Sequence, residues 1–173
     1  MRRLSKKDDI GLTEMAIHYL YARSFFTELP FEDKTAFEYF LKQAEAKWLS
    51  QSLYGQGMIA LAVKRWDGTS SVPDKIVASL NEKAQHSDEL GMYWKFDAGY
   101  RFFEMPIETQ AMLIEAYAEV SKQGSAIDEM RLWLLKNKQT NRWHNTKATA
   151  AAIYSLLLFG DSWLEETKLP AIT

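Results

Sequence analysis

The stretch "RWHNTKATAAAIYSLLLFG", residues 142–160, decides the fold. A Trp, a His and an Asn stand before a run of Thr and Ala, which then becomes Ile, Tyr and Leu. This order predicts a helix that begins near Thr146, capped by Asn145 or Thr146, and ends at Gly160. Small residues at a helix start let that end approach its neighbours closely, so we interpret the run as packing surface rather than chemistry. We expect the packing stripe of this helix to carry Thr149, Ala152, Ile153, Leu156 and Leu157.

The same pattern occurs once more upstream. Thr109, Ala111 and Leu113 of "IETQAMLIEAY" (107–117) align with Thr149, Ala151 and Ile153 of "KATAAAIYSLL" (147–157). A Trp-containing segment precedes each copy, and "GQGMIALAVKRW" (55–66) is a poorer third copy. An offset of about 40 residues indicates one helix pair per repeat, in which stacked hairpins bury a shared core.

Helical periodicity covers most of the remaining chain. We expect Pro106 to begin a helix that stops at Gly124 as its C′ residue, and capping boxes at Ser71–Asp74 and Ser125–Asp128 to open two others. Residues 86–105 read as irregular and aromatic-rich. The apolar stripes are Leu12, Met15, Ala16, Tyr19 and Leu20; Phe37, Phe40, Leu41, Ala44 and Trp48; Met58, Ile59, Leu61, Ala62 and Val63; Ile76, Val77, Leu80 and Ala84; Ile107, Ala111, Ile114 and Tyr117; and Ile127, Met130, Leu134 and Leu135.

These stripes, with no convincing alternating strand pattern, predict an all-α domain of about seven helices that spans residues 1–173. The linkers are mostly short, which favours antiparallel neighbours.

Composition limits the classes of function. Hydrophobic residues make up 47% and aromatic residues 13% of 173 residues, enough for one sizeable core. The net charge of -2 argues against a nucleic-acid partner, which usually requires a basic stripe. The absence of cysteine excludes disulfides, thiolate metal sites and a Cys nucleophile. We also expect no membrane insertion by this segment and no signal peptide, because no sufficiently long apolar run occurs.

The block from Leu90 to Leu158 resembles the C-terminal part of the helical thioester-type domain of the alpha-2-macroglobulin and complement family, most closely its bacterial branch. A Trp-bearing segment, the "IETQA" helix (107–111), "RLWLLKNKQ" (131–139) and the "TKATAAAIYSLL" helix (146–157) follow in the family's order, and "DSWL" (161–164) suits its exit to the next domain. Residues from about 12 to 87 carry weaker motifs.

The resemblance implies an α/α toroid, in which helical hairpins form inner and outer rings. About seven helices are too few for a complete ring of six hairpins, so the resemblance also implies a C-terminal fragment of that domain. Family members are typically exported, with a periplasmic, cell-surface or extracellular location, and act as broad protease traps. The implied function is therefore a non-catalytic interaction domain in endopeptidase inhibition, whose partners are other domains of its parent chain and proteases.

One departure from the family pattern concerns its reactive centre. That centre is a Cys-Gly-Glu-Gln run whose Cys and Gln side chains form a thioester, and this chain has no Cys. Gly55-Gln56-Gly57 is no substitute for the run. No thioester is therefore expected here. We also expect no metal, no cofactor and no catalytic residue.

Four residues are candidates for a surface or pocket role: Trp94, Tyr100, Trp143 and His144. His144 lies beside Trp143 at the expected mouth of a helix layer, but a general base would also need an orienting carboxylate, which the sequence does not place. The aromatic segment 93–103 favours a core edge over a ligand pocket.

The other two histidines have simpler interpretations. His18 lies in the first stripe and is expected to pack or cap, and His86 is expected at a solvated helix end. No two histidines have zinc-binding HxxxH spacing.

Two alternative functions stay open. One is an α/α-toroid enzyme acting on polysaccharides or isoprenoids, which would need converging acids or a metal in a cavity. The other is a helical scaffold unrelated to proteases.

Overall fold

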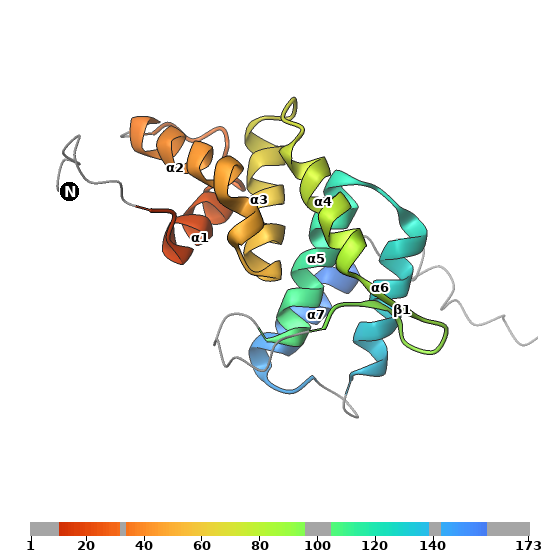
Figure 1. Cartoon of the computed structure of the whole chain (residues 1–173). Helices are drawn as coiled ribbons and strands as arrows, with labels where there is room; N and C mark the ends of the chain where they lie inside the picture. The colour runs from red at the N-terminus through yellow and green to blue at the C-terminus, as the bar shows by residue number, and fades with distance from the viewer. Residues whose placement is uncertain (1–10, 32–33, 96–104, 139–142, 159–173) are drawn as a thin grey trace, which may run out of the picture.

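The computed structural model describes residues 11–31, 34–95, 105–138 and 143–158. Helices dominate these residues, which confirms the predicted all-α class (Figure 1). The elements are α1 (Glu14–Arg23), α2 (Lys34–Lys47), a 3-10 turn η1 (Trp48–Ser50), α3 (Leu53–Trp66), α4 (Val72–Lys83), β1 (Gln85–Ser87), β2 (Gly91–Tyr93), α5 (Pro106–Val120), α6 (Gly124–Lys136) and α7 (Thr146–Leu157).

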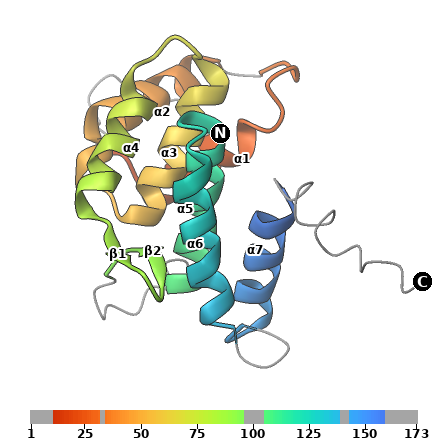
Figure 2. The ribbon, with the colours of Figure 1, turned by 90° about the vertical axis from the view of Figure 1, so that its right-hand side faces the viewer.

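The odd-numbered helices form a row. α1 contacts α3, α3 contacts α5, and α5 contacts α7. Each of α2, α4 and α6 packs on the odd-numbered helix that precedes it, and α2 and α4 also contact the one that follows. In Figure 2, α5 and α6 stand between α4 on the left and α7 on the right. This pattern of neighbours is typical of stacked helical hairpins.

The helices of the row run in the same direction. Arg65, near the end of α3, contacts Glu115 in the second half of α5, and Tyr21 near the end of α1 donates a hydrogen bond to the same Glu115. The starts of α5 and α7 also meet, because Lys147 forms an ion pair with Glu108. The C-terminal ends of neighbouring helices in the row therefore lie together, and so do their N-terminal ends. Along the chain, an even-numbered helix lies between each two neighbours of the row. This geometry is expected when successive helical hairpins stack in the same orientation.

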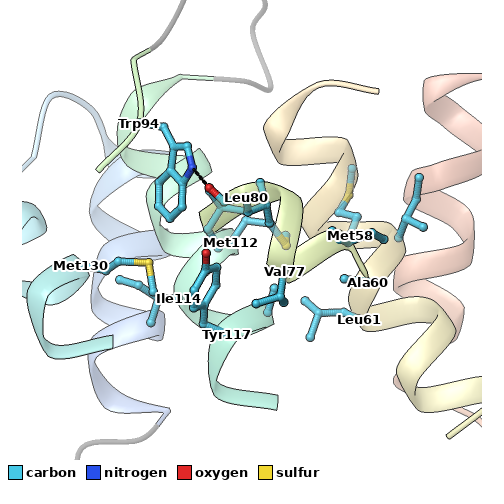
Figure 3. Close-up of a cluster of buried hydrophobic side chains, with 14 of the residues drawn as sticks. Met58, Ala60, Leu61, Val77, Leu80, Trp94, Met112, Ile114, Tyr117 and Met130 are labelled. Carbon is cyan, nitrogen blue, oxygen red and sulfur yellow. Dashed lines mark hydrogen bonds between the residues drawn. The ribbon is translucent and has the colours of Figure 1, made fainter. Parts of the chain in front are cut away.

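α5 is the central helix of the described structure. Every residue from Ile107 to Tyr117 is buried, including four polar ones, because α3, α4, α6 and α7 all contact this helix. A helix buried on every side is enclosed in the core rather than resting on it. Figure 3 shows the part of the core made by α3, α4, α5 and α6; its labelled side chains include Met58, Leu61, Val77, Leu80, Met112, Ile114, Tyr117 and Met130.

Two Trp residues link the segments that precede α5 and α7 to the ends of α4 and α6. We call each of these links a joint. The indole Nε1 of Trp94 donates to the Leu80 carbonyl of α4 at 2.9 Å, drawn as the dashed line in Figure 3. Trp143 does the same to the Leu134 carbonyl of α6 at 2.8 Å. The first residues of α5 and α7 are separated by the same offset as the two sequence copies. The predicted repeat is therefore present as a structural unit with a common joint.

The predicted stripes of α3 and α5 are buried as expected, but those of α1 and α7 are partly wrong. Met15 and Tyr19 of the predicted stripe are 78% and 50% exposed, whereas Ile17 and Leu20 are buried. Within the described residues, a helix at the end of the row has fewer neighbours to cover it, and neighbouring stripes of similar hydropathy do not tell which side those neighbours cover.

The α7 stripe differs in a similar way. Ile153 and Leu157 are exposed, and the buried residues are Ala148, Ala152 and Ser155. Their spacing of four and three residues places them on one face of the helix, where small side chains allow close contact with α5. The predicted end at Gly160 lies outside the described residues, and α7 ends at Leu157.

The region predicted as irregular contains a short antiparallel hairpin. β1 and β2 pair through Gln85 with Tyr93, His86 with Met92, and Ser87 with Gly91. The strands have three residues each, too few for an alternating pattern to stand out. His86 therefore lies on a strand rather than at a helix end.

Two predicted capping features are also wrong. Gly124 is the first residue of α6 rather than the C′ residue of α5, and Lys122 adopts the positive φ of 54° after α5. Ser125 lies inside the first turn, so Ser125–Asp128 is not a capping box. α4 does begin after Ser71, but the Ser71 side chain makes no capping hydrogen bond. Asn145 caps α7 as predicted, accepting from the Ala148 N–H at 2.8 Å.

Candidate functional site

Two of the four residues that the sequence singled out line one pocket. Trp94 and His144, which are far apart along the chain, both contribute to a cavity of about 580 Å³ near the N-terminal ends of α5 and α7. Trp143 is buried, with its indole bonded to Leu134, and is not among the lining residues. Tyr100 lies outside the described residues. The pocket residues are Tyr93, Trp94, Met105, Pro106, Ile107, Glu108, Trp133, Asn137, His144, Asn145 and Ala148.

Local sequence explains why these elements converge. Pro106 begins α5, where its missing N–H is no loss, and Asn145 begins α7 as its cap. Gly91, with φ of 74°, brings β2 against the backbone of Glu129 in α6, where a Cβ atom would overlap it. The hairpin thereby carries Tyr93 and Trp94 to the pocket wall.

A buried amide ties three elements together beside the pocket. Gln110 of α5 is fully buried, and its Nε2 donates to the Met92 carbonyl of β2 at 2.8 Å and to the Met130 carbonyl of α6 at 3.3 Å. Amide donors that satisfy backbone acceptors in a core rigidify the elements that they join. The pocket wall made by β2 and α6 is therefore fixed to α5.

Glu108 is the most unusual residue of the pocket. It is 3% exposed, and neither carboxylate oxygen has a hydrogen-bond partner. The Nζ of Lys147 in α7 forms an ion pair with Oε1 at 3.8 Å, which is too long for a hydrogen bond. The first turn of α5 favours a negative charge at this position. A carboxylate buried in this way lacks the donors that such groups usually have.

A second polar cluster lies in the C-terminal halves of α1, α3 and α5, away from the pocket at the N-terminal ends. Arg65 of α3 donates from Nε to Glu119 at 2.9 Å and from Nη2 to Glu115 at 2.7 Å, and its Nη1 bonds to Ser24 at 3.1 Å. The guanidinium also lies 4.2 Å from the ring centre of Phe25. Tyr21 completes the cluster through Glu115, at 2.8 Å. We call these residues the Arg65 cluster.

Burial and charge shift the pKa values in the Arg65 cluster. Burial alone would lower the pKa of Arg65, but hydrogen bonds and charges of Glu119 and Glu115 raise it further above its ordinary range. Burial, followed by the charge of Glu115, raises the pKa of Tyr21 and of Tyr154 in α7. The raised pKa values keep the Tyr21 phenol neutral and the Arg65 guanidinium charged at ordinary pH, which favours a structural role for the cluster.

The remaining histidines occupy unrelated places. The His18 ring packs 5.9 Å from that of Tyr54, as the packing interpretation predicted. His86 is exposed, and its Nδ1 lies 3.1 Å from Glu129. In the described ranges no three His, Asp or Glu side chains gather into a possible metal site. In the same ranges, every helix falls short of the length and apolar content that a bilayer-spanning helix needs.

Sequence reasoning missed Glu108, Arg65 and Glu115. A signal was available for the two acids, because both interrupt the otherwise apolar or uncharged run 107–117 and their seven-residue spacing places them on one helix face. A charge that recurs on one face of a strongly apolar helix indicates a buried partner. Arg65 had no comparable signal, because a basic residue in a last helical turn is ordinary.

Comparison with protein-family models and with curated proteins finds no match to this chain.

Proposed function

We propose that this chain is a non-catalytic interaction domain built as a partial α/α toroid, and that its parent is an alpha-2-macroglobulin-like protein that traps or restrains proteases. The observation that carries the proposal is the row of parallel helices α1, α3, α5 and α7, with α2, α4 and α6 packed beside it. A row that curls would make the inner ring of a toroid and the even-numbered helices its outer ring.

The repeated joint supports the same arrangement. Trp94 links the segment before α5 to the end of α4, and Trp143 links the segment before α7 to the end of α6. Both belong to the Trp-bearing segments on which the resemblance of residues 90–158 rests.

Exposed side chains on α7, the last helix among the described residues, support an interaction role. Three large side chains of α7 are exposed within five residues: Ile153 at 46%, Tyr154 at 43% and Leu157 at 64%. Single exposed apolar residues are normal, but a contiguous group indicates a contact surface. We propose that another domain of the same parent chain covers this α7 surface (Ile153, Tyr154 and Leu157), in a periplasmic or cell-surface setting.

The proposed role is mechanical. Cleavage of the parent chain by a protease would change which surfaces of this domain contact the other domains. Such a change requires contacts that differ between the uncleaved and the cleaved state. With no Cys, this segment itself would not form an acyl bond to a protease.

The two other functions receive less support. An enzyme acting on glycosidic bonds would need two carboxylates at a defined separation, and among the described residues the pocket lining contains one, Glu108. A scaffold without a protease connection has the same fold, so the experiment below separates it from the leading proposal.

The test uses the full-length protein that contains this chain, incubated with trypsin and, separately, with elastase. A trap encloses the protease, so activity on a large protein substrate is lost while activity on a short chromogenic peptide is retained. Unchanged activity on both substrates would identify a scaffold. The α7 surface is tested in the same protein with Leu157→Asp, which is expected to weaken trapping. Leu49→Asp is the matched control, because Leu49 is also 64% exposed but lies in η1.

A further inference from the structure

The geometry of the pocket between α5 and α7 points to a binding site for an alkylammonium group, the cation carried by lysine side chains and by small aliphatic amines. This inference goes beyond the interaction role proposed above and does not depend on it. It rests on the burial of Glu108, on its missing hydrogen bonds and on the aromatic lining of the pocket.

The pocket lining combines deeply buried residues with exposed polar residues. Among the lining residues, Trp94, Glu108 and Ala148 are at most 3% exposed, whereas Asn137, His144 and Asn145 are exposed. A ligand that contacts Glu108 therefore loses water as it approaches the buried carboxylate. Ligand sites commonly combine an apolar enclosure with a few polar groups that fix orientation.

Glu108 supplies the charge for recognition. A buried carboxylate without donors is costly, because burial removes the hydrogen bonds that water would make. Lys147 compensates part of the charge from 3.8 Å but gives Glu108 no hydrogen bond. An ammonium ion carries three N–H donors and no acceptor, so it matches the two unsatisfied oxygens and the negative charge together.

The walls favour an organic cation over a metal ion. Tyr93, Trp94 and Trp133 line the pocket, and the rings of Tyr93 and Trp133 are stacked at 6.2 Å. Aromatic rings attract ammonium groups through their faces and also accommodate alkyl chains. A calcium or magnesium ion would need several oxygen ligands, whereas Glu108 is the one carboxylate among the lining residues that the structure describes.

Trp94 gives this wall a fixed position. Its Nε1 is bonded to the Leu80 carbonyl, and its ring meets Tyr117 edge-on at a centroid distance of 6.0 Å. The aromatic wall is therefore preformed, which reduces the entropy that binding would otherwise cost.

The test is a titration of the full chain with n-butylammonium chloride, followed by calorimetry and by amide NMR shifts. We expect saturable binding in roughly the millimolar range, as suits so small a ligand, with shifts at His144 and Asn145. The uncharged analogue 1-butanol is expected to bind about tenfold more weakly or not at all, because it lacks the charged hydrogen bond. Equal binding of the two ligands, or no binding of either, would overturn the proposal without any variant.

Glu108→Gln tests the carboxylate directly, because it keeps the shape and removes the charge. We expect at least about a tenfold loss of n-butylammonium affinity, with an unchanged circular dichroism spectrum. Glu38→Gln is the matched control, since Glu38 is a half-exposed carboxylate on α2, and it should leave the affinity unchanged. Undiminished binding by a folded Glu108→Gln variant would exclude Glu108 as the recognising group.

Two further ligands distinguish the sources of the cation. A capped Gly-Lys-Gly peptide that binds more tightly than n-butylammonium would identify a lysine side chain of a protein partner. Binding of n-butylammonium without binding of the peptide would identify a small free amine. The Nζ-acetylated peptide, which has lost the positive charge, should not bind in either case.

Discussion

The indole N–H of Trp143 donates to the carbonyl of Leu134, and the end of α6 explains why that carbonyl is available. The Lys138 N–H, which would be its helical partner, bonds to the Leu135 carbonyl at 3.2 Å instead. α4 ends in the same way. The Ala84 N–H donates to the Asn81 carbonyl, and the Trp94 indole N–H donates to the Leu80 carbonyl. Each Trp thus satisfies an acceptor that a helix end leaves unpaired.

Trp143→Phe is expected to lower the free energy of unfolding by about 1–3 kcal/mol, because it leaves the Leu134 carbonyl buried without a donor. Trp94→Phe should have a similar effect at the other joint. Trp48→Phe is the control, since Trp48 is partly buried against the core and its indole shows no hydrogen bond in the described ranges. Denaturant unfolding measures all three. Equal losses at the three positions would show that ring size, not the hydrogen bond, matters.

Arg65→Met is expected to destabilise the protein by about 3–5 kcal/mol, because it leaves Glu115 charged and buried without its cation. The Glu115 side chain is 3% exposed, so solvent cannot replace the guanidinium. The double variant Arg65→Met with Glu115→Gln should recover much of the loss. The measurement is a double-mutant cycle by denaturant unfolding.

Glu119→Gln serves as the comparison for the double-mutant cycle of Arg65 and Glu115. Glu119 also binds Arg65, but its side chain is 27% exposed, so its loss should cost less than the loss of Arg65. A strictly additive double variant would contradict the coupling of Arg65 to Glu115.

Stability is expected to fall in alkali through Tyr21. Burial, together with the charge of Glu115, raises the folded-state pKa of Tyr21. The stabilising contribution is therefore complete below the unfolded-state pKa of about 10 and is lost as the pH rises beyond it. Tyr21→Phe removes this ionisation and should reduce the slope of stability against pH between about pH 9 and about pH 11. Tyr19→Phe, at a half-exposed position, should keep the wild-type slope.

Gly91→Ala is expected to cost about 2 kcal/mol or more, because φ of 74° disfavours a side chain and the new Cβ would overlap the Glu129 backbone. Gly124→Ala is the opposite case: nothing lies within 4 Å of its Cβ position at the start of α6, so the change should be neutral or stabilising. Thermal and denaturant unfolding compare the two. A harmless Gly91→Ala would mean that the hairpin does not approach α6 as closely as described.

Much of the helical pattern was predictable because the signals are local. The apolar residues of α3 and α5, the Asn145 cap and the spacing of the repeat follow from neighbours along the chain. The hairpin of β1 and β2 was not predictable, because three-residue strands carry too few side chains to establish a period. Which face of α1 and α7 is buried was equally undetermined, because it depends on which helix lies opposite.

The sequence by itself determined that the chain is helical, that its hairpins repeat and that Trp94 and Trp143 mark corresponding joints, since propensity, periodicity and spacing act over short distances. Only the tertiary structure brought Trp94, Glu108 and His144 to one pocket, and Tyr21, Arg65 and Glu115 to one buried cluster. The physical reason is that a side chain's partners and its access to water are set by helices that meet in space, across separations along the chain that no local pattern encodes.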